Sequence, residues 1–196
     1  MALAKQAKIL TKAQVEAILG YVNAKRHRLR NRVIVLLSVR AGMRAKEIAS
    51  LTWEMVTDAD GEIGNAIHLQ NCASKGRTGG RIIPLNTELR NALKDLRHHP
   101  QRGRPSPYVV TTERATKASA QTVVNIFFSW HHDLGLNGCS SHSGRRTFIT
   151  NAARKISTVG GSLRDVQMLA GHSSLTTTQR YIEGSGEAQR RIVDLL

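Results

Sequence analysis

Residues 29–51 read LRNRVIVLLSVRAGMRAKEIASL, and this stretch carries the pattern from which the fold is best predicted. Leu29–Val39 is apolar nearly all round, which predicts a central helix buried on most of its faces. Gly42 follows and predicts the end of that helix, because glycine readily takes the left-handed conformation of a helix C-terminus. A short helix from about Arg44 to Leu51 is expected next, so an arginine stands directly after a helix break.

The segments on both sides of this stretch predict a mainly helical fold. Upstream, Thr11 to Gln14 form a candidate capping box for an amphipathic helix. Downstream, glycines and aspartates separate short apolar runs at residues 66–69 and 81–85, which indicate a small antiparallel sheet. Helical patterns return at residues 86–97, 123–130 and 148–156. We therefore expect an α+β protein, mainly α with a small antiparallel β-sheet, in a single domain that spans residues 1–196.

The chain is strongly basic, and its basic residues are spread along its whole length. Its 196 residues include 29 Lys and Arg against 14 Asp and Glu, a formal net charge of +15. A folded body of this charge favours a polyanionic partner, nucleic acid first, because neutralising phosphates releases condensed counterions. An alkaline protein with another role has the same composition, so charge alone leaves both interpretations open.

Cysteine usage and hydropathy indicate a soluble protein of a reducing compartment. Cys72 and Cys139 lie far apart and lack neighbours at metal-ligand spacing, so we expect free thiols. The longest apolar run, near residues 33–39, is much shorter than the ~20 residues that a membrane span requires. The start of the sequence lacks the apolar stretch of a signal peptide. The expected location is the cytoplasm.

Two stretches in the first half of the chain carry candidate phosphate-binding residues. Arg44 follows the helix break, and Glu47 lies three residues later on the same helical face, where its carboxylate could hold the guanidinium. Residues 74–81 (SKGRTGGR) place Lys75 and two arginines on a glycine-rich turn between the predicted strands. Such a turn could lie against a phosphate backbone, and Lys75 could donate a proton. Alone, these patterns also fit a surface ion pair and a solvated turn.

Two further stretches lie in the second half. His142 and Arg145 are three residues apart, so on a helix that begins at Ser140 or Ser141 they project from one side near the anion-binding N-terminus. A capped surface helix would read the same. His172 and Tyr181 are nine residues apart, which in one unbroken helix places them on roughly opposite faces. Gly171 is expected to end one helix, and Ser173 or Ser174 to begin another, so that both side chains can turn toward one place.

Read together, these residues resemble the ordered catalytic set of the tyrosine recombinases, the phage integrase family. The resemblance covers about residues 10–185 and includes the family's Gly-His and Tyr spacing at 171–181. Gly144 and Arg146 stand where the family commonly has Leu and His, which concerns local packing. The catalytic set that the resemblance implies is Arg44, Lys75, His142, Arg145, His172 and Tyr181, with Glu47 in support.

The resemblance implies an enzyme that cleaves and rejoins DNA strands. Tyr181 would attack a phosphodiester to give a 3′-phosphotyrosyl bond, and Lys75 would protonate the leaving 5′-hydroxyl. No cofactor, metal or nucleotide is expected, because the bond to tyrosine conserves the energy of the cut. The implied partner is double-stranded DNA, with a homotetramer on two DNA sites when active and a monomer possible without DNA. Further DNA contacts are expected from Arg77, Arg81, Arg102, Arg104 and Arg146.

The resemblance also raises questions about both ends of the chain. It implies an N-terminal helical domain of about a hundred residues that embraces the DNA, and the sequence has room for none before the catalytic set. We expect either a shortened form or a short member of the family. The tail at residues 186–196 ends in an apolar stripe, which could dock on a neighbouring protomer or pack on its own domain.

Two other functions remain open from the sequence. A type IB topoisomerase uses a similar tyrosine, arginine and lysine set to relax supercoils, but the Gly-His spacing before Tyr181 favours the recombinase. A DNA-binding regulator that has lost catalysis is the second, and the complete catalytic set argues against it.

Overall fold

The computed structural model describes residues 7–70, 80–99, 105–181, 190 and 193–194. The chain divides into two compact units, Met1–Phe148 and Ile149–Leu196. The predicted single domain stays a prediction.

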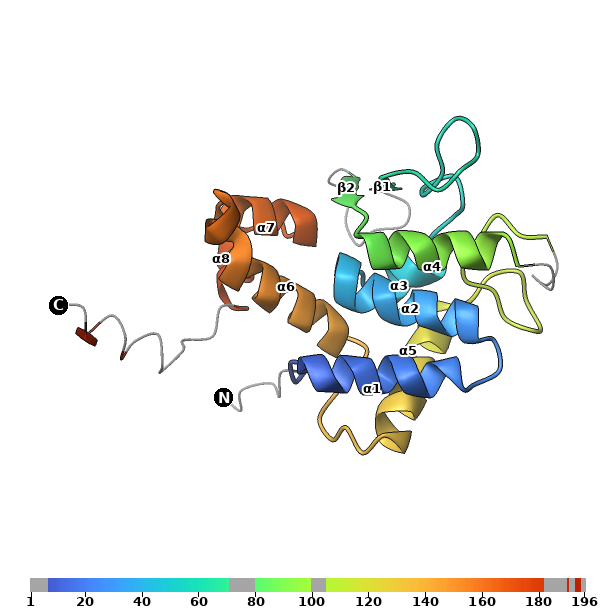
Figure 1. Cartoon of the computed structure of the whole chain (residues 1–196), viewed down its shortest axis with the longest axis horizontal. Helices are drawn as coiled ribbons and strands as arrows, with labels where there is room; N and C mark the ends of the chain where they lie inside the picture. Colours follow the sequence, from blue (N-terminus) through green and yellow to red (C-terminus); the bar gives the residue numbers. More distant parts are fainter. Residues whose placement is uncertain (1–6, 71–79, 100–104, 182–189, 191–192, 195–196) are drawn as a thin grey trace. The chain divides into compact units, whose positions relative to one another are not determined.

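The first unit is mainly helical, as the sequence predicts. Figure 1 shows α1, α2 and α4 side by side, and α5 packs against α3 and α1. A two-stranded antiparallel sheet completes it, with Ala66 opposite Pro84 and Leu69 opposite Arg81. The elements of this unit are α1 (Lys12–Asn23), α2 (Arg28–Ala41), α3 (Ala45–Ser50), β1 (Ala66–Leu69), β2 (Arg81–Pro84), α4 (Thr87–Arg97), α5 (Ala120–Asp133) and the start of α6 (Ser143–Lys155).

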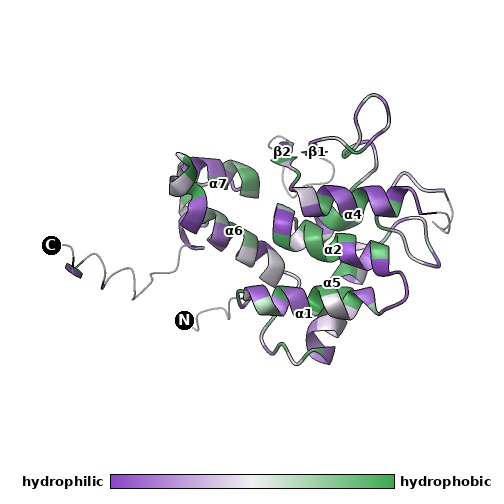
Figure 2. Ribbon diagram, in the orientation of Figure 1, coloured by the Kyte–Doolittle hydropathy of each residue, from purple (hydrophilic) through white to green (hydrophobic). Residues whose placement is uncertain are grey.

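The second unit continues from α6, and between residues 156 and 181 it contains three short elements. These are the 3-10 helix η2 (Ile156–Val159), α7 (Leu163–Ala170) and α8 (Leu175–Gln179). Figure 2 shows α7 and α4 with green and purple residues in alternation, as expected of helices with one apolar face.

The local signals in the sequence explain where these helices begin and end. Thr11 caps α1 through a capping box with Gln14, whose side chain returns to the Thr11 N–H at 2.9 Å. Gly42 and Gly171 both have a left-handed backbone and end α2 and α7. Ser174 precedes α8, although its side chain makes no capping hydrogen bond.

The core of the first unit surrounds α2, as its composition predicts. Nine of the fourteen α2 residues are buried, and the fully buried ones include Ile34, Leu36 and Leu37. Gly144 on α6 permits close packing there, because a Cβ at this position would overlap Ser38 of α2. The glycine that departs from the common family pattern therefore has a packing reason.

Within the described part of the chain, no helix combines the length and hydrophobicity that a bilayer crossing requires. Cys139 is a free, half-buried cysteine. Cys72 and most of the tail at 186–196 lie outside the described residues.

Candidate active site

Arg44 lies at the corner between α2 and α3. It is the N-cap of α3 with an extended backbone, one residue before the first turn where the sequence placed it. Its Nη1 donates to Glu47 Oε1 at 2.8 Å, the ion pair that the three-residue spacing predicts. Its backbone N–H donates to Glu47 Oε2 at 2.8 Å. Glu47 thus fixes the Arg44 side chain, which is 25% exposed and therefore still meets solvent.

Arg81 completes this cluster, in a role that the sequence did not predict. Its two terminal nitrogens donate to the two carboxylate oxygens of Glu47, each at 2.9 Å. The Arg81 side chain is 10% exposed. The sequence predicted that Arg81 contacts DNA, whereas in the structure its guanidinium binds the buried Glu47 carboxylate. A basic turn next to a strand carries no sign of this, because the partner lies 34 residues away.

Glu47 is fully buried and ionised. Burial by itself would raise the pKa of this carboxyl, but the hydrogen bonds and charges of Arg81 and then Arg44 outweigh it and lower the pKa to about 2. The cluster of Arg44, Glu47 and Arg81 therefore carries one net positive charge at neutral pH.

Arg145 is tied to the same corner. Its Nη1 donates at 2.5 Å to the backbone carbonyl of Gly42, which lies two residues before Arg44. Arg145 itself is 3% exposed. Gly42 has φ of 60°, and a Cβ there would overlap the Phe148 ring. The start of α6 and the α2–α3 corner are thus packed closely, with an arginine bridging them.

His142 differs in part from its prediction. Helix α6 begins at Ser143, so His142 precedes the helix, whose expected start was Ser140 or Ser141. The reason is local: Ser140 accepts hydrogen bonds from the N–H groups of His142 and Ser143 in a turn. His142 is exposed, and its carbonyl accepts from the Arg146 N–H at 2.9 Å.

The other expected cations fall into two groups. Arg146 is 9% exposed, so it is buried where the sequence expected a residue that faces DNA. Helix position alone does not reveal this burial, because it depends on what packs over α6. The remaining ones lie outside the described residues: Lys75, Arg77, Arg102 and Arg104.

His172 and Tyr181 lie together in the second unit. Their rings are stacked, with centroids 5.2 Å apart and planes inclined by 28°. Gly171 ends α7 and α8 begins at Leu175, so the chain turns between the two residues as the sequence predicts. Tyr181 itself follows α8 and is half-buried.

Three contacts that the sequence did not reveal support this pair. His172 Nδ1 lies 3.0 Å from Thr178 Oγ1, and Gln167 Nε2 donates to the His172 carbonyl at 2.9 Å. The Thr150 hydroxyl donates to the Tyr181 carbonyl at 3.0 Å. Thr178 and Thr150 are fully buried, so one holds the His172 ring and the other holds the backbone of Tyr181.

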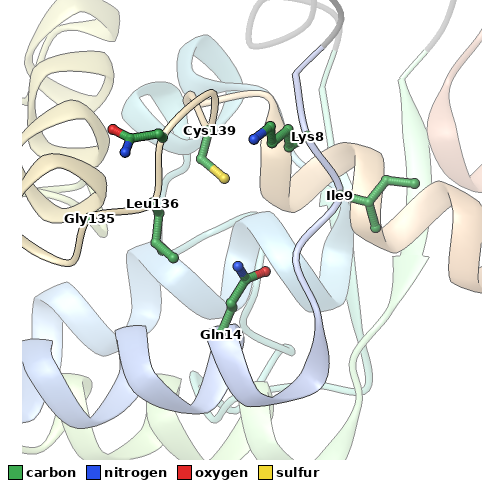
Figure 3. Close-up of a pocket in the computed structure, with 7 residues that line it drawn as sticks. Lys8, Ile9, Gln14, Gly135, Leu136 and Cys139 are labelled. Atoms are coloured by element: carbon green, nitrogen blue, oxygen red, sulfur yellow. The ribbon is translucent and has the colours of Figure 1, made fainter.

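None of the candidate residues that the structure describes lines the cavity shown in Figure 3. This cavity of about 190 Å³ lies in the first unit between the start of the chain and the loop after α5. Among the described residues, no group of three or more His, Cys, Asp or Glu side chains could hold a metal ion. The residues around the cavity are Lys8, Ile9, Gln14, Gly135, Leu136, Asn137 and Cys139.

Comparison with known proteins identifies the family. The model of the phage integrase family matches residues 8–187. The chain belongs to this family. It is 29% identical over 190 residues to the tyrosine recombinase XerA of Pyrococcus furiosus, covering 95% of this chain and 61% of the relative. It is 30% identical over 200 residues to the tyrosine recombinase XerD of Pseudomonas aeruginosa, covering 96% of this chain and 60% of the relative. The chain thus spans about three fifths of these relatives.

Solved structures of this family share the fold. A XerA recombinase crystal structure matches with a TM-score of 0.76 and 21% identity, covering 95% of this chain and 64% of that one. The Tn1549 transposon integrase in complex with circular intermediate DNA matches with a TM-score of 0.73 and 19% identity, covering 100% of this chain and 68% of that one. The mainly helical fold with a small antiparallel sheet is therefore confirmed as that of integrase family members.

Proposed function

We propose that this integrase family chain is the catalytic part of a site-specific recombinase that cleaves and rejoins DNA through a tyrosine-linked intermediate. The observation that carries the proposal is the stacked pair of His172 and Tyr181, held by buried threonines at the spacing of the family motif. Tyr181 is the proposed nucleophile.

In the proposed reaction the Tyr181 oxygen attacks the phosphorus of a phosphodiester. The bond from phosphorus to the 5′-oxygen breaks, and the 3′-phosphate remains on the tyrosine. His142 assists removal of the tyrosine proton, Lys75 gives a proton to the leaving 5′-oxygen, and His172 donates a hydrogen bond to the phosphate. Attack of the free 5′-hydroxyl of a partner strand reverses these steps and rejoins the DNA.

Arg44 and Arg145 are the proposed ligands of the non-bridging oxygens. Both are permanently charged and can each donate two hydrogen bonds to the charge that builds up in the transition state. Arg44 already meets solvent, whereas Arg145 is 3% exposed. Phosphate binding at Arg145 therefore requires a rearrangement that exposes its guanidinium.

The proposed substrate is double-stranded DNA, and the chain acts on it in the cytoplasm, at the nucleoid. The net charge of +15 and the family support this partner. The related Tn1549 integrase and a lambda integrase dimer were solved bound to DNA. The active form is proposed to be a homotetramer on two DNA sites. Sedimentation with and without the duplex tests this, and a complex that stays monomeric on cleavable DNA contradicts it.

The test is covalent capture on DNA. A pool of random-sequence duplexes with a nick traps any cleaved strand, because the short fragment next to the nick diffuses away. Protein–DNA adducts are separated on a denaturing gel, and the captured strands are sequenced. We expect adducts enriched in one sequence, and unchanged yield in EDTA. A chain that binds duplexes and forms no adduct with any of them contradicts the proposed function.

A further inference from the structure

The paired hydrogen bonds between Arg81 and Glu47 bear on how the Arg44 side chain is positioned for its substrate. Glu47 accepts four hydrogen bonds, two from Arg81 and two from Arg44, at 2.8 to 2.9 Å. A carboxylate has about four acceptor positions, so the group is fully used. The planar fork of Arg81 fixes the carboxylate plane, and this plane fixes where Oε1 meets the Arg44 guanidinium.

We propose that Arg81 is a positioning residue for Arg44, acting through Glu47. The inference rests on the proposed function, in which Arg44 binds the phosphate. This role takes the place of the expected DNA contact for Arg81, whose side chain is 10% exposed and whose guanidinium donates to Glu47. Arg44, at 25% exposure, is the member of the cluster that can meet a ligand.

Charge supports the same role. A buried carboxylate paired with Arg44 alone would neutralise it and weaken its stabilisation of the charge that builds up on the phosphate in the transition state. Arg81 supplies a second positive charge, so that the cluster keeps one net positive charge beside Arg44. Without Arg81, the Glu47 carboxylate is also free to rotate and to take up more of the Arg44 donors, which would then be lost to the substrate.

Arg81 also links two parts of the first unit that are distant in sequence. It is the first residue of β2, while Glu47 lies on α3. The ion pair thus ties the base of the hairpin to the corner that holds Arg44. A loss of Arg81 is expected to disturb the Arg44 geometry first, because the two arginines share both carboxylate oxygens.

The experiment measures single-turnover adduct formation on a captured nicked duplex, together with the Kd of that duplex. For Arg81→Gln we expect the rate constant at saturating protein to fall about 10- to 100-fold, with Kd and its salt dependence unchanged. Arg81→Lys should recover part of the rate, because it restores the charge without the fork. The matched control is Arg32→Gln, which removes an ion pair to Glu88 of 2.9 Å elsewhere in the same unit. Its rate should stay as in the wild type.

The opposite pattern overturns the proposal. If Arg81→Gln raises Kd, lowers the log–log salt slope by about one and keeps the saturated rate, Arg81 is a phosphate contact. Equal losses in Arg81→Gln and Arg32→Gln, with falling thermal stability in both, indicate a purely structural role. Should Arg81→Gln fail to fold, Arg81→Lys provides the same comparison at constant charge.

A second readout separates this inference from the proposed function. Solvent exchange of the Arg44 Nη1 hydrogens, the side-chain group that donates to Glu47, followed by NMR without DNA, should be faster in Arg81→Gln than in the wild type. If the wild type forms no adduct on any duplex, the proposed function fails, and this exchange rate alone decides the positioning claim. Unchanged exchange at Arg44 contradicts it.

Discussion

The corner around Arg44 and the turn that carries Tyr181 are built in opposite ways. Arg44 stands on a corner whose neighbours Met43, Ile48 and Leu51 are fully buried, and a fully buried carboxylate holds it. The elements around Tyr181 are short, and Val159, Met168 and Leu175 are exposed there by 77%, 63% and 39%. The Arg44 guanidinium is therefore held in place by a core, while the proposed nucleophile depends on a few polar anchors.

The largest effect is expected at the turn. Tyr181→Phe removes only the phenolic oxygen, so it should abolish adduct formation and leave duplex binding nearly intact. Denaturing gels and a binding titration measure the two properties. The matched control is Tyr108→Phe in the first unit, which should form adducts normally. Adducts that persist in Tyr181→Phe would assign the nucleophile elsewhere.

The next effect belongs to the corner. Arg145→Lys keeps the charge but removes the paired donors, so adduct formation should slow about 100-fold. Arg154→Lys, at the exposed end of the same helix, is the control and should behave as the wild type. Single-turnover rates on the captured duplex provide the measurement. A rate for Arg145→Lys within experimental error of the wild type excludes a two-pronged clamp.

The sequence predicted the local features of both regions and missed the long-range ones. Gly42 and Gly171 mark helix ends through their own backbone freedom, and Thr11 through a partner three residues away, so short windows suffice. The bond from Arg145 to Gly42 spans 103 residues, and the one from Arg81 to Glu47 spans 34. No window of sequence distinguishes such a buried arginine from one that faces DNA.

The buried carboxylate predicts acid sensitivity at the corner. The pKa of Glu47 is lowered from 4.5 to about 2, so its stabilising effect is complete above pH 4.5 and is lost as the pH falls toward 2. The shift corresponds to roughly 3 kcal/mol of unfolding free energy. Urea unfolding across this pH range measures the loss.

Two variants assign that loss to Glu47. Glu47→Gln should be less stable at neutral pH and should lack this part of the acid dependence. Glu16→Gln is the control, because its pair with Lys12 is exposed and 3.9 Å long. An acid profile of Glu47→Gln that matches the wild type would mean that other carboxyl groups cause the loss.

Two glycines that end helices, Gly42 after α2 and Gly160 after η2, differ in the space beside them. Both have a left-handed backbone, with φ of 60° and 74°, so alanine should cost about 1–2 kcal/mol at either position. At Gly42 the new Cβ would also overlap the Phe148 ring, which adds about 1–3 kcal/mol, whereas a Cβ at Gly160 would meet nothing within 4 Å. Gly42→Ala should therefore lower the thermal midpoint more than Gly160→Ala.

Gly42→Ala should also slow adduct formation, because the strained residue carries the carbonyl that Arg145 binds. Gly20→Ala is the control, since its surroundings are open and its backbone is helical, and it should be neutral or stabilising. Equal losses at Gly42 and Gly160 would show that backbone conformation alone sets the cost, and that the corner around Arg44 is packed no more tightly than the end of η2.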